Sequence, residues 1–73
     1  MKIETLEELE QVRPTLRLSG RDGNAFSILA GCKKAARKAG LRDASELNRL
    51  QTEMFSGDYD HVIQTAMKYF DVD

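Results

Sequence analysis

The residues best suited to chemistry begin in a two-glycine loop, Gly20-Arg21-Asp22-Gly23, which leads into Asn24 and a helical pattern. Glycines let a backbone turn tightly and approach a ligand, and the first N–H groups of a helix favour an anion. Arg21 adds a charge that pairs well with phosphate. The loop has no Gly-Lys-Ser/Thr and no third glycine, and its KH-like Gly-x-x-Gly spacing falls between a strand and a helix. We therefore keep phosphate or nucleotide binding at Gly20, Arg21, Gly23 and Asn24 as the alternative to an ordinary structural turn.

A cluster of cations follows on the next helix: Lys33, Lys34, Arg37 and Lys38. Helical spacing places all four opposite the apolar stripe, so we expect them to be solvated together. Such a face can bind an acidic protein surface or follow a nucleic-acid backbone. Cations near a helix C-terminus also complement the helix dipole, and no aromatic residue is interleaved to stack on bases.

The third candidate is an acidic group formed by Asp58, Asp60 and, further along, Asp71. The alternating aspartates lack the glycine and the later glutamate of a calcium-binding loop. Asp58 is better interpreted as a helix N-cap, with Asp60 in the first turn, and His61 lies on the polar side of the same helix. We assign no metal and no cofactor.

Catalysis is not expected. Cys32 is the sole cysteine and lies in an apolar stripe, where it acts as a small hydrophobe, and His61 is the sole histidine. A nucleophile needs a base within hydrogen-bond reach and a group that orients the base. The pattern predicts a protein that is not an enzyme.

Charge is segregated along the chain, although the net charge is only -1. Residues 21–42 hold six Lys or Arg and one Asp, whereas residues 43–73 hold seven Asp or Glu and two Lys or Arg. The two blocks either face each other, within the fold or across a dimer, or steer a charged partner.

The N-terminal part predicts a two-turn helix followed by a short strand. Thr5 and Glu8 form a capping box, and Pro14 stops the helix. Residues 15–18 then alternate between polar and apolar. The strand has three possible partners, which are the tail around Val72, residues near Ile3, or a second copy of the chain.

Three longer helices are predicted after the strand. The first is capped by Asn24 or Asp22 and ends at Gly40, and the others begin after Asp43 and Asp58. The expected fold class is mainly α, a small three-helix domain with a short N-terminal helix and one short β-strand, and α+β if the strand pairs. Residues 1–14 are expected to be an N-terminal helical extension and residues 15–73 a single small helical domain.

Four segments of the chain carry a resemblance: residues 18–29 (LSGRDGNAFSIL), 37–40 (RKAG), 56–61 (SGDYDH) and 69–72 (YFDV). Together they resemble small uncharacterised proteins of bacteriophages and integrated prophages. The likeness covers residues 15–73. It implies no activity, but short phage proteins are often accessory factors that inhibit a host enzyme or defence complex, and others bind nucleic acid or trap a nucleotide.

These observations predict a non-enzymatic accessory protein that binds a host or phage protein through Lys33, Lys34, Arg37 and Lys38 or through Asp58 and Asp60. No apolar run approaches the roughly 20 residues of a membrane span, so we expect a cytoplasmic protein of the bacterial host cell. A chain of 73 residues has a thin core, and we also expect a homo-oligomer.

Overall fold

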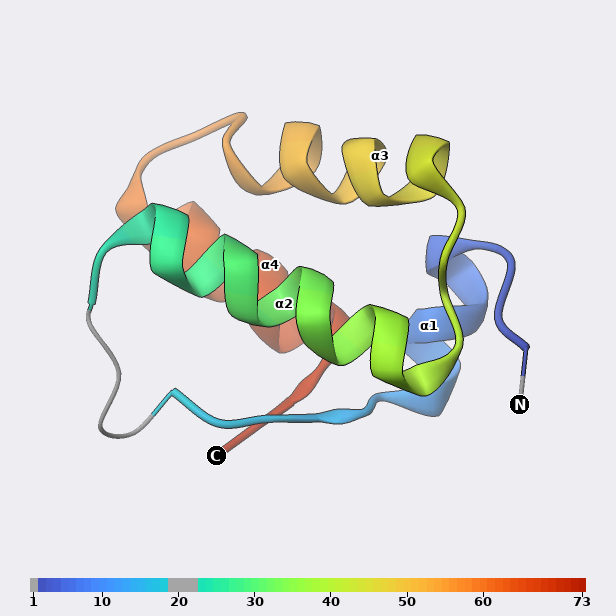
Figure 1. Cartoon of the computed structure of the whole chain (residues 1–73). Coiled ribbons are helices and arrows are strands. Elements are labelled where there is room, and N and C mark those ends of the chain that lie inside the picture. Colours follow the sequence, from blue (N-terminus) through green and yellow to red (C-terminus); the bar gives the residue numbers. More distant parts are fainter. Residues whose placement is uncertain (1, 19–22) are drawn as a thin grey trace.

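A computed structural model describes residues 2–18 and 23–73 of the chain. The described part is mainly helical, as the sequence predicts, with one short helix and three longer ones (Figure 1). The helices are α1 (Leu6–Val12), α2 (Ala25–Ala39), α3 (Ala44–Met54) and α4 (Tyr59–Tyr69), and the strands are β1 (Thr15–Leu16) and β2 (Asp71–Val72).

Each helix begins at a short polar side chain that accepts a hydrogen bond from the backbone of the first turn, as N-caps do. The pattern confirms the predicted caps of α1, α3 and α4, and it selects Asn24 for α2, since Asp22 lies outside the described residues. Gly40 ends α2 with φ 120°, a conformation that favours glycine. The capping bonds are Thr5 to Glu8 N–H (3.2 Å), Asn24 to Phe26 N–H (2.8 Å), Asp43 to Ser45 N–H (2.8 Å) and Asp58 to His61 N–H (3.1 Å).

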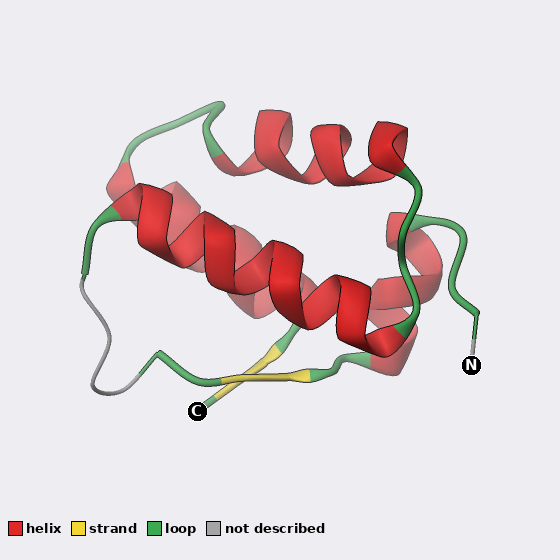
Figure 2. Ribbon diagram, in the orientation of Figure 1, coloured by secondary structure: helices red, strands yellow, loops and turns green. Residues whose placement is uncertain are grey.

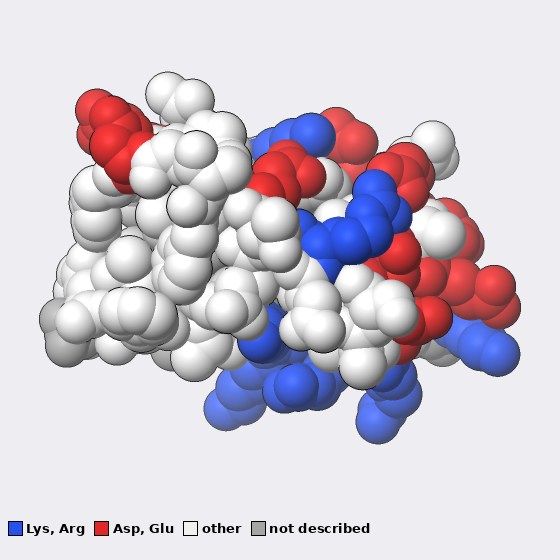
Figure 3. Space-filling view, turned by 90° about the horizontal axis from the view of Figure 1, so that it is seen from above, with Lys and Arg blue, Asp and Glu red and all other residues white. Residues whose placement is uncertain are grey.

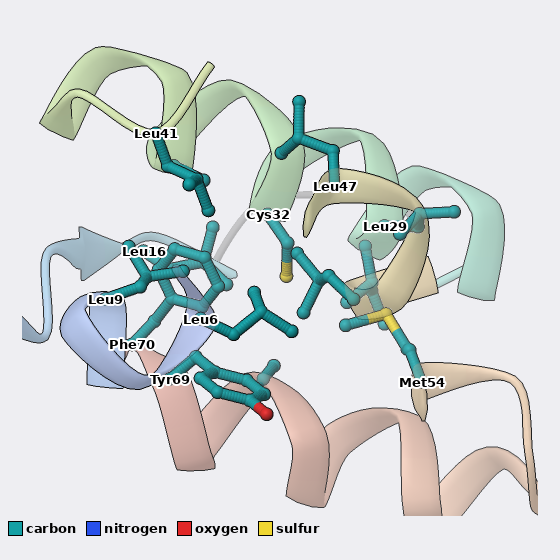
Figure 4. Close-up of a cluster of buried hydrophobic side chains, with 14 of the residues drawn as sticks. Leu6, Leu9, Leu16, Leu29, Cys32, Leu41, Leu47, Met54, Tyr69 and Phe70 are labelled. Atoms are coloured by element: carbon teal, nitrogen blue, oxygen red, sulfur yellow. The ribbon is translucent and has the colours of Figure 1, made fainter. Parts of the chain in front are cut away.

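One hydrophobic core joins all the elements (Figure 4). Phe70, at the end of α4, is completely buried, and so is Cys32 on the inward face of α2. The N-terminal segment shares this core, because Leu6 and Leu9 of α1 are also completely buried and α1 packs against α4. Ile3, Leu6 and Leu9 of the segment 1–14, which the sequence predicts to be an N-terminal helical extension, thus belong to this core.

The short strand pairs with the C-terminal tail, so one of the three partners left open by the sequence is selected. β1 and β2 are parallel, with Thr15 opposite Asp71 and Leu16 opposite Val72 (Figure 2). Ile3 forms a separate parallel bridge with Leu41 instead. The pairing adds a small strand layer below α2, and β1 runs alongside α2 in the opposite direction (Figure 1).

Candidate functional site

A groove lies between α2 and β1, and we call it the α2–β1 groove. Its volume is about 350 Å³, and a second hollow of about 300 Å³ continues it toward the C-terminus of α2. The strand side is formed by residues 14–17. The helix side is formed by Gly31, Lys34, Ala35, Lys38 and Ala39.

The floor of this groove is made of small residues on one face of α2. Gly31, Ala35 and Ala39 follow one another at four-residue spacing, so they lie one above the other along the helix. Because their side chains are short, β1 approaches α2 and still leaves a hollow above the contact. The sequence pattern predicts no groove at this place.

Lys34 and Lys38 lie along the helix side of the groove, one turn apart and exposed. Within residues 2–18 and 23–73, neither ammonium group has a carboxylate within 4.0 Å, and the same holds for Arg37 and Arg42. The acidic block pairs elsewhere, for example Glu53 with Lys68. The positive charge of α2 is therefore left for solvent or for a partner.

The space-filling view shows the same segregation of charge. Lys and Arg side chains protrude mainly along the lower edge of the molecule, whereas Asp and Glu gather chiefly at the end that holds α1 (Figure 3). The left half of the face seen in this view is largely uncharged, apart from an acidic group at its upper corner (Figure 3).

Lys33 is set apart from the other three cations. It is half-buried, and its Nζ donates a hydrogen bond of 2.8 Å to Gln51 Oε1 on α3. This contact ties α2 to α3, so Lys33 departs from the expectation that all four cations are solvated together. Lys34, Arg37 and Lys38 are exposed, as expected.

Asp58 and Asp60 lie away from the groove, whereas Asp71 lies on β2, opposite the groove residue Thr15. Asp58 and Asp60 begin α4, which starts beside the N-terminus of α2, where the Tyr59 hydroxyl donates to the Gly23 carbonyl at 2.6 Å. Asp58 is engaged as the N-cap, and Asp60 is exposed. The exposed cations of α2 and the pair Asp58 and Asp60 thus form two separate surfaces rather than one site.

Half of the candidate phosphate loop lies outside the described residues, namely Gly20 and Arg21. The other half is engaged within the fold, since the Gly23 carbonyl accepts from Tyr59 and Asn24 Oδ1 caps α2.

A Ser–His contact that the sequence analysis missed lies at the end of α3. Ser56 Oγ is 3.1 Å from His61 Nε2, a distance that suits a nucleophile and its base. Both groups, however, bind the Glu53 carbonyl, at 2.7 Å from Ser56 Oγ and 2.8 Å from His61 Nε2. A carbonyl only accepts, so Nε2 carries the hydrogen and cannot take a proton from Ser56. The pair caps the C-terminus of α3.

Glu53 also joins α3 to α4 through its side chain. Its carboxylate accepts from the Tyr69 hydroxyl at 2.7 Å and from Lys68 Nζ at 3.0 Å. Burial acts to raise the pKa of Glu53, but the bonds from Tyr69 and Lys68 outweigh it, and the pKa lies below its ordinary value. Burial and the bond to Glu53 raise the pKa of Tyr69. These groups support the packing of the two helices.

No group of three or more His, Cys, Asp or Glu side chains is arranged to hold a metal ion in residues 2–18 and 23–73. No helix in the same ranges has the length and apolar character needed to cross a membrane.

Comparison with known proteins gives no further assignment. The chain matches no protein-family model, no curated protein and no solved structure.

Proposed function

We propose that this protein is a non-enzymatic binding domain whose basic α2 face binds an acidic surface of a protein partner. The observation that carries the proposal is the pair Lys34 and Lys38, which stand exposed beside the α2–β1 groove with no carboxylate partner in the described residues. Charged groups left uncompensated on one face steer a complementary partner and select it over others.

Two features favour an acidic protein over a nucleic acid. The residues that line the groove include no aromatic side chain on which a base could stack. Nucleic acid is also a long polyanion that extends beyond a small patch, and it would meet the acidic α1, which contains Glu7, Glu8 and Glu10. A compact acidic protein surface matches the size of the basic face and avoids this repulsion.

The phage resemblance suggests the setting. A short accessory protein that blocks a host enzyme or defence complex needs a binding surface and no catalytic group. The proposed partner is accordingly a bacterial host protein with an exposed acidic region.

The test is affinity capture from bacterial lysate with a charge-reversed variant and a matched control. Lys34→Glu/Lys38→Glu reverses the groove cations, whereas Lys2→Glu/Arg42→Glu reverses two exposed cations that do not line the groove. We expect a nuclease-resistant protein to be captured by the wild type and by the control but not by K34E/K38E. Equal capture by all three proteins would refute the proposal, and capture lost on nuclease treatment would assign the face to nucleic acid.

A further inference from the structure

The backbone of β1 has one paired edge and one open edge. The ladder to the tail consists of Asp71 N–H to the Pro14 carbonyl (3.0 Å), Asp73 N–H to the Leu16 carbonyl (2.9 Å) and Leu18 N–H to the Asp73 carbonyl (3.1 Å). Residues 14, 16 and 18 therefore direct their hydrogen-bonding groups toward β2. Since these groups alternate along a strand, the N–H and C=O of Thr15 point to the opposite edge. Within the described residues the sheet consists of β1 and β2 alone, so no strand pairs with the other edge of β1.

Thr15, whose backbone groups form the open edge, is also a lining residue of the α2–β1 groove. Thr15 lines both hollows of the groove, opposite Ala35 and Lys38 of α2. A strand edge beside a groove is the arrangement used in β-strand addition, where an extended peptide contributes the missing strand. The small residues Gly31 and Ala35 of α2 leave a hollow of about 350 Å³ beside Thr15.

The charges at the groove select the chemistry of that strand. Lys34 and Lys38 are one helical turn apart, and Cβ atoms at this spacing are separated by about 6 Å. Alternate residues of an extended peptide are separated by about 6.6 Å and point to the same face. Carboxylates at alternate positions therefore match the two ammonium groups.

An acidic segment already pairs with the other edge of β1. The tail that pairs with β1 reads Asp71-Val72-Asp73, with an acid at alternate positions. Its Asp73 carboxylate lies 3.8 Å from Arg17 Nε. An acidic, alternating segment is thus compatible with pairing against β1.

We propose that the partner engages this protein through an extended segment with alternating acidic residues, which adds to the open edge of β1 while its carboxylates bind Lys34 and Lys38. This inference rests on the proposed function, since it names the part of an acidic protein that fills the groove. Backbone hydrogen bonds to Thr15 supply the register, and the lysines supply the selectivity.

The first experiment titrates the protein with the synthetic peptide Ac-Asp-Val-Asp-Val-Asp-NH2 and follows its backbone amides by NMR. We expect saturable shifts centred on Thr15, Gly31 and Lys38. K34E/K38E should weaken binding by about tenfold or more, and K2E/R42E should leave it nearly unchanged. The matched peptide Ac-Lys-Val-Lys-Val-Lys-NH2 should not bind. Shifts elsewhere, or equal binding of both peptides, would overturn the inference.

A second pair of peptides tests the backbone contact itself. In strand addition only alternate peptide N–H groups face β1, so N-methylation of either the Asp set or the Val set should abolish binding while the other set leaves it intact. Because the carboxylates must face the lysines, the sensitive set also reports whether the added strand is parallel or antiparallel. Equal effects of the two sets would exclude strand addition.

The groove is tested from the protein side by Ala35→Gln, which places a long side chain on its floor, with Ala30→Gln as the control at an exposed position of the same helix. A35Q should lose peptide binding and A30Q should keep it, with helical content checked by circular dichroism.

The combined outcomes separate the two proposals. If K34E/K38E abolishes capture of the lysate protein but neither A35Q nor N-methylation changes peptide binding, the proposed function stands and strand addition fails. If charge reversal matters in neither assay, both proposals fail. Displacement of the peptide by a short deoxythymidine oligonucleotide would instead assign the groove to nucleic-acid binding.

Discussion

Arg13 joins the end of α1 to the end of α4 through a single side chain. Its guanidinium donates to the backbone carbonyls of Met67 (2.9 Å), Lys68 (2.9 Å) and Phe70 (3.0 Å). These carbonyls belong to the last turn of α4, where they have no helical N–H partner. The planar fork of arginine reaches several acceptors at once, which the point charge of lysine does not.

We therefore predict that Arg13→Lys lowers the free energy of unfolding by about 1.5 to 3 kcal/mol, the range for hydrogen bonds that involve a charged group. Urea denaturation followed by circular dichroism measures the change. Arg42→Lys is the matched control, because Arg42 is exposed and forms no ion pair in the described residues. It should change stability by less than about 0.5 kcal/mol. Equal effects of the two substitutions would show that the carbonyl contacts contribute little.

The carboxyl group of Glu53 makes the free energy of unfolding depend on pH. Its pKa is lower in the folded protein than in the unfolded chain, because the bonds from Tyr69 and Lys68 outweigh the opposing effect of burial. A lowered carboxyl pKa contributes stability that is complete above the ordinary value of about 4.3 and is lost as the pH falls through the folded-state value. We predict that the free energy of unfolding decreases below about pH 4.3 and that this decrease is smaller in Glu53→Gln.

Urea titrations at a series of acidic pH values test this prediction. Glu10→Gln is the control, since Glu10 forms no ion pair within the described ranges. It should retain the wild-type dependence on pH. An unchanged acid dependence in E53Q would mean that other carboxylates govern the acid response.

Side chains that act on their own neighbours could be predicted from the sequence, and those that act across the fold could not. Thr5 and Asp58 each accept a hydrogen bond from the backbone N–H three residues further along the chain, so the spacing of residue types is enough to predict these caps. Glu46 instead accepts from the Leu6 N–H at 2.8 Å, and Arg13 reaches residues more than fifty positions away. Nothing in the local pattern specifies such pairs, because they depend on how the helices are placed.

At the scale of elements, the turn between α3 and α4 depends on Gly57. A Cβ atom built there would lie 2.9 Å from His61 Cβ and 3.0 Å from His61 Cγ. The ring has little freedom to move, since its Nε2 is bonded to the Glu53 carbonyl. We predict that Gly57→Ala destabilises the protein by about 1 to 3 kcal/mol, the usual cost of an overpacked contact.

Gly23→Ala is the matched control for Gly57→Ala, and thermal unfolding measures the stability of both variants. At Gly23 an added Cβ would meet the Tyr59 hydroxyl at 3.5 Å, which is an ordinary van der Waals distance. Gly23→Ala should therefore be close to neutral. If the contact with His61 Cβ and Cγ is the cause, Gly57→Ala should cost less stability in a His61→Gly background, which lacks both atoms, than in the wild type. A neutral G57A would show that the turn adjusts freely.

The strand layer shows where element-level prediction stops. Alternation in residues 15–18 indicated a strand, and the ladder extends to Leu18, but three partners remained open until the structure selected the tail. The groove is equally non-local, because it arises from the small residues of α2 only once β1 crosses them. Its lysines were identified in the sequence, whereas the strand edge that faces them was not.

At the scale of the whole molecule, α1 shares one hydrophobic core with the other helices. Leu9 is completely buried in the common core, although residues 1–14 looked like an addition to a helical domain. A chain of 73 residues has a total stability of about 4 to 11 kcal/mol, so each large core side chain is a sizeable fraction of it. Loss of one leucine from α1 must then affect every helix.

We predict that Leu9→Ala lowers the free energy of unfolding by about 2 to 5 kcal/mol, because it leaves a cavity in the interior. Unfolding should remain a single transition in which circular dichroism and tyrosine fluorescence, to which the buried Tyr69 and the exposed Tyr59 both contribute, change together. Val12→Ala is the control, since Val12 is 42% exposed and its truncation should cost less than about 1 kcal/mol. If L9A instead lost only the amide signals of α1 while α2, α3 and α4 kept theirs, the N-terminal helix would be a separable unit. The groove would then remain intact without it, since its lining begins at Pro14.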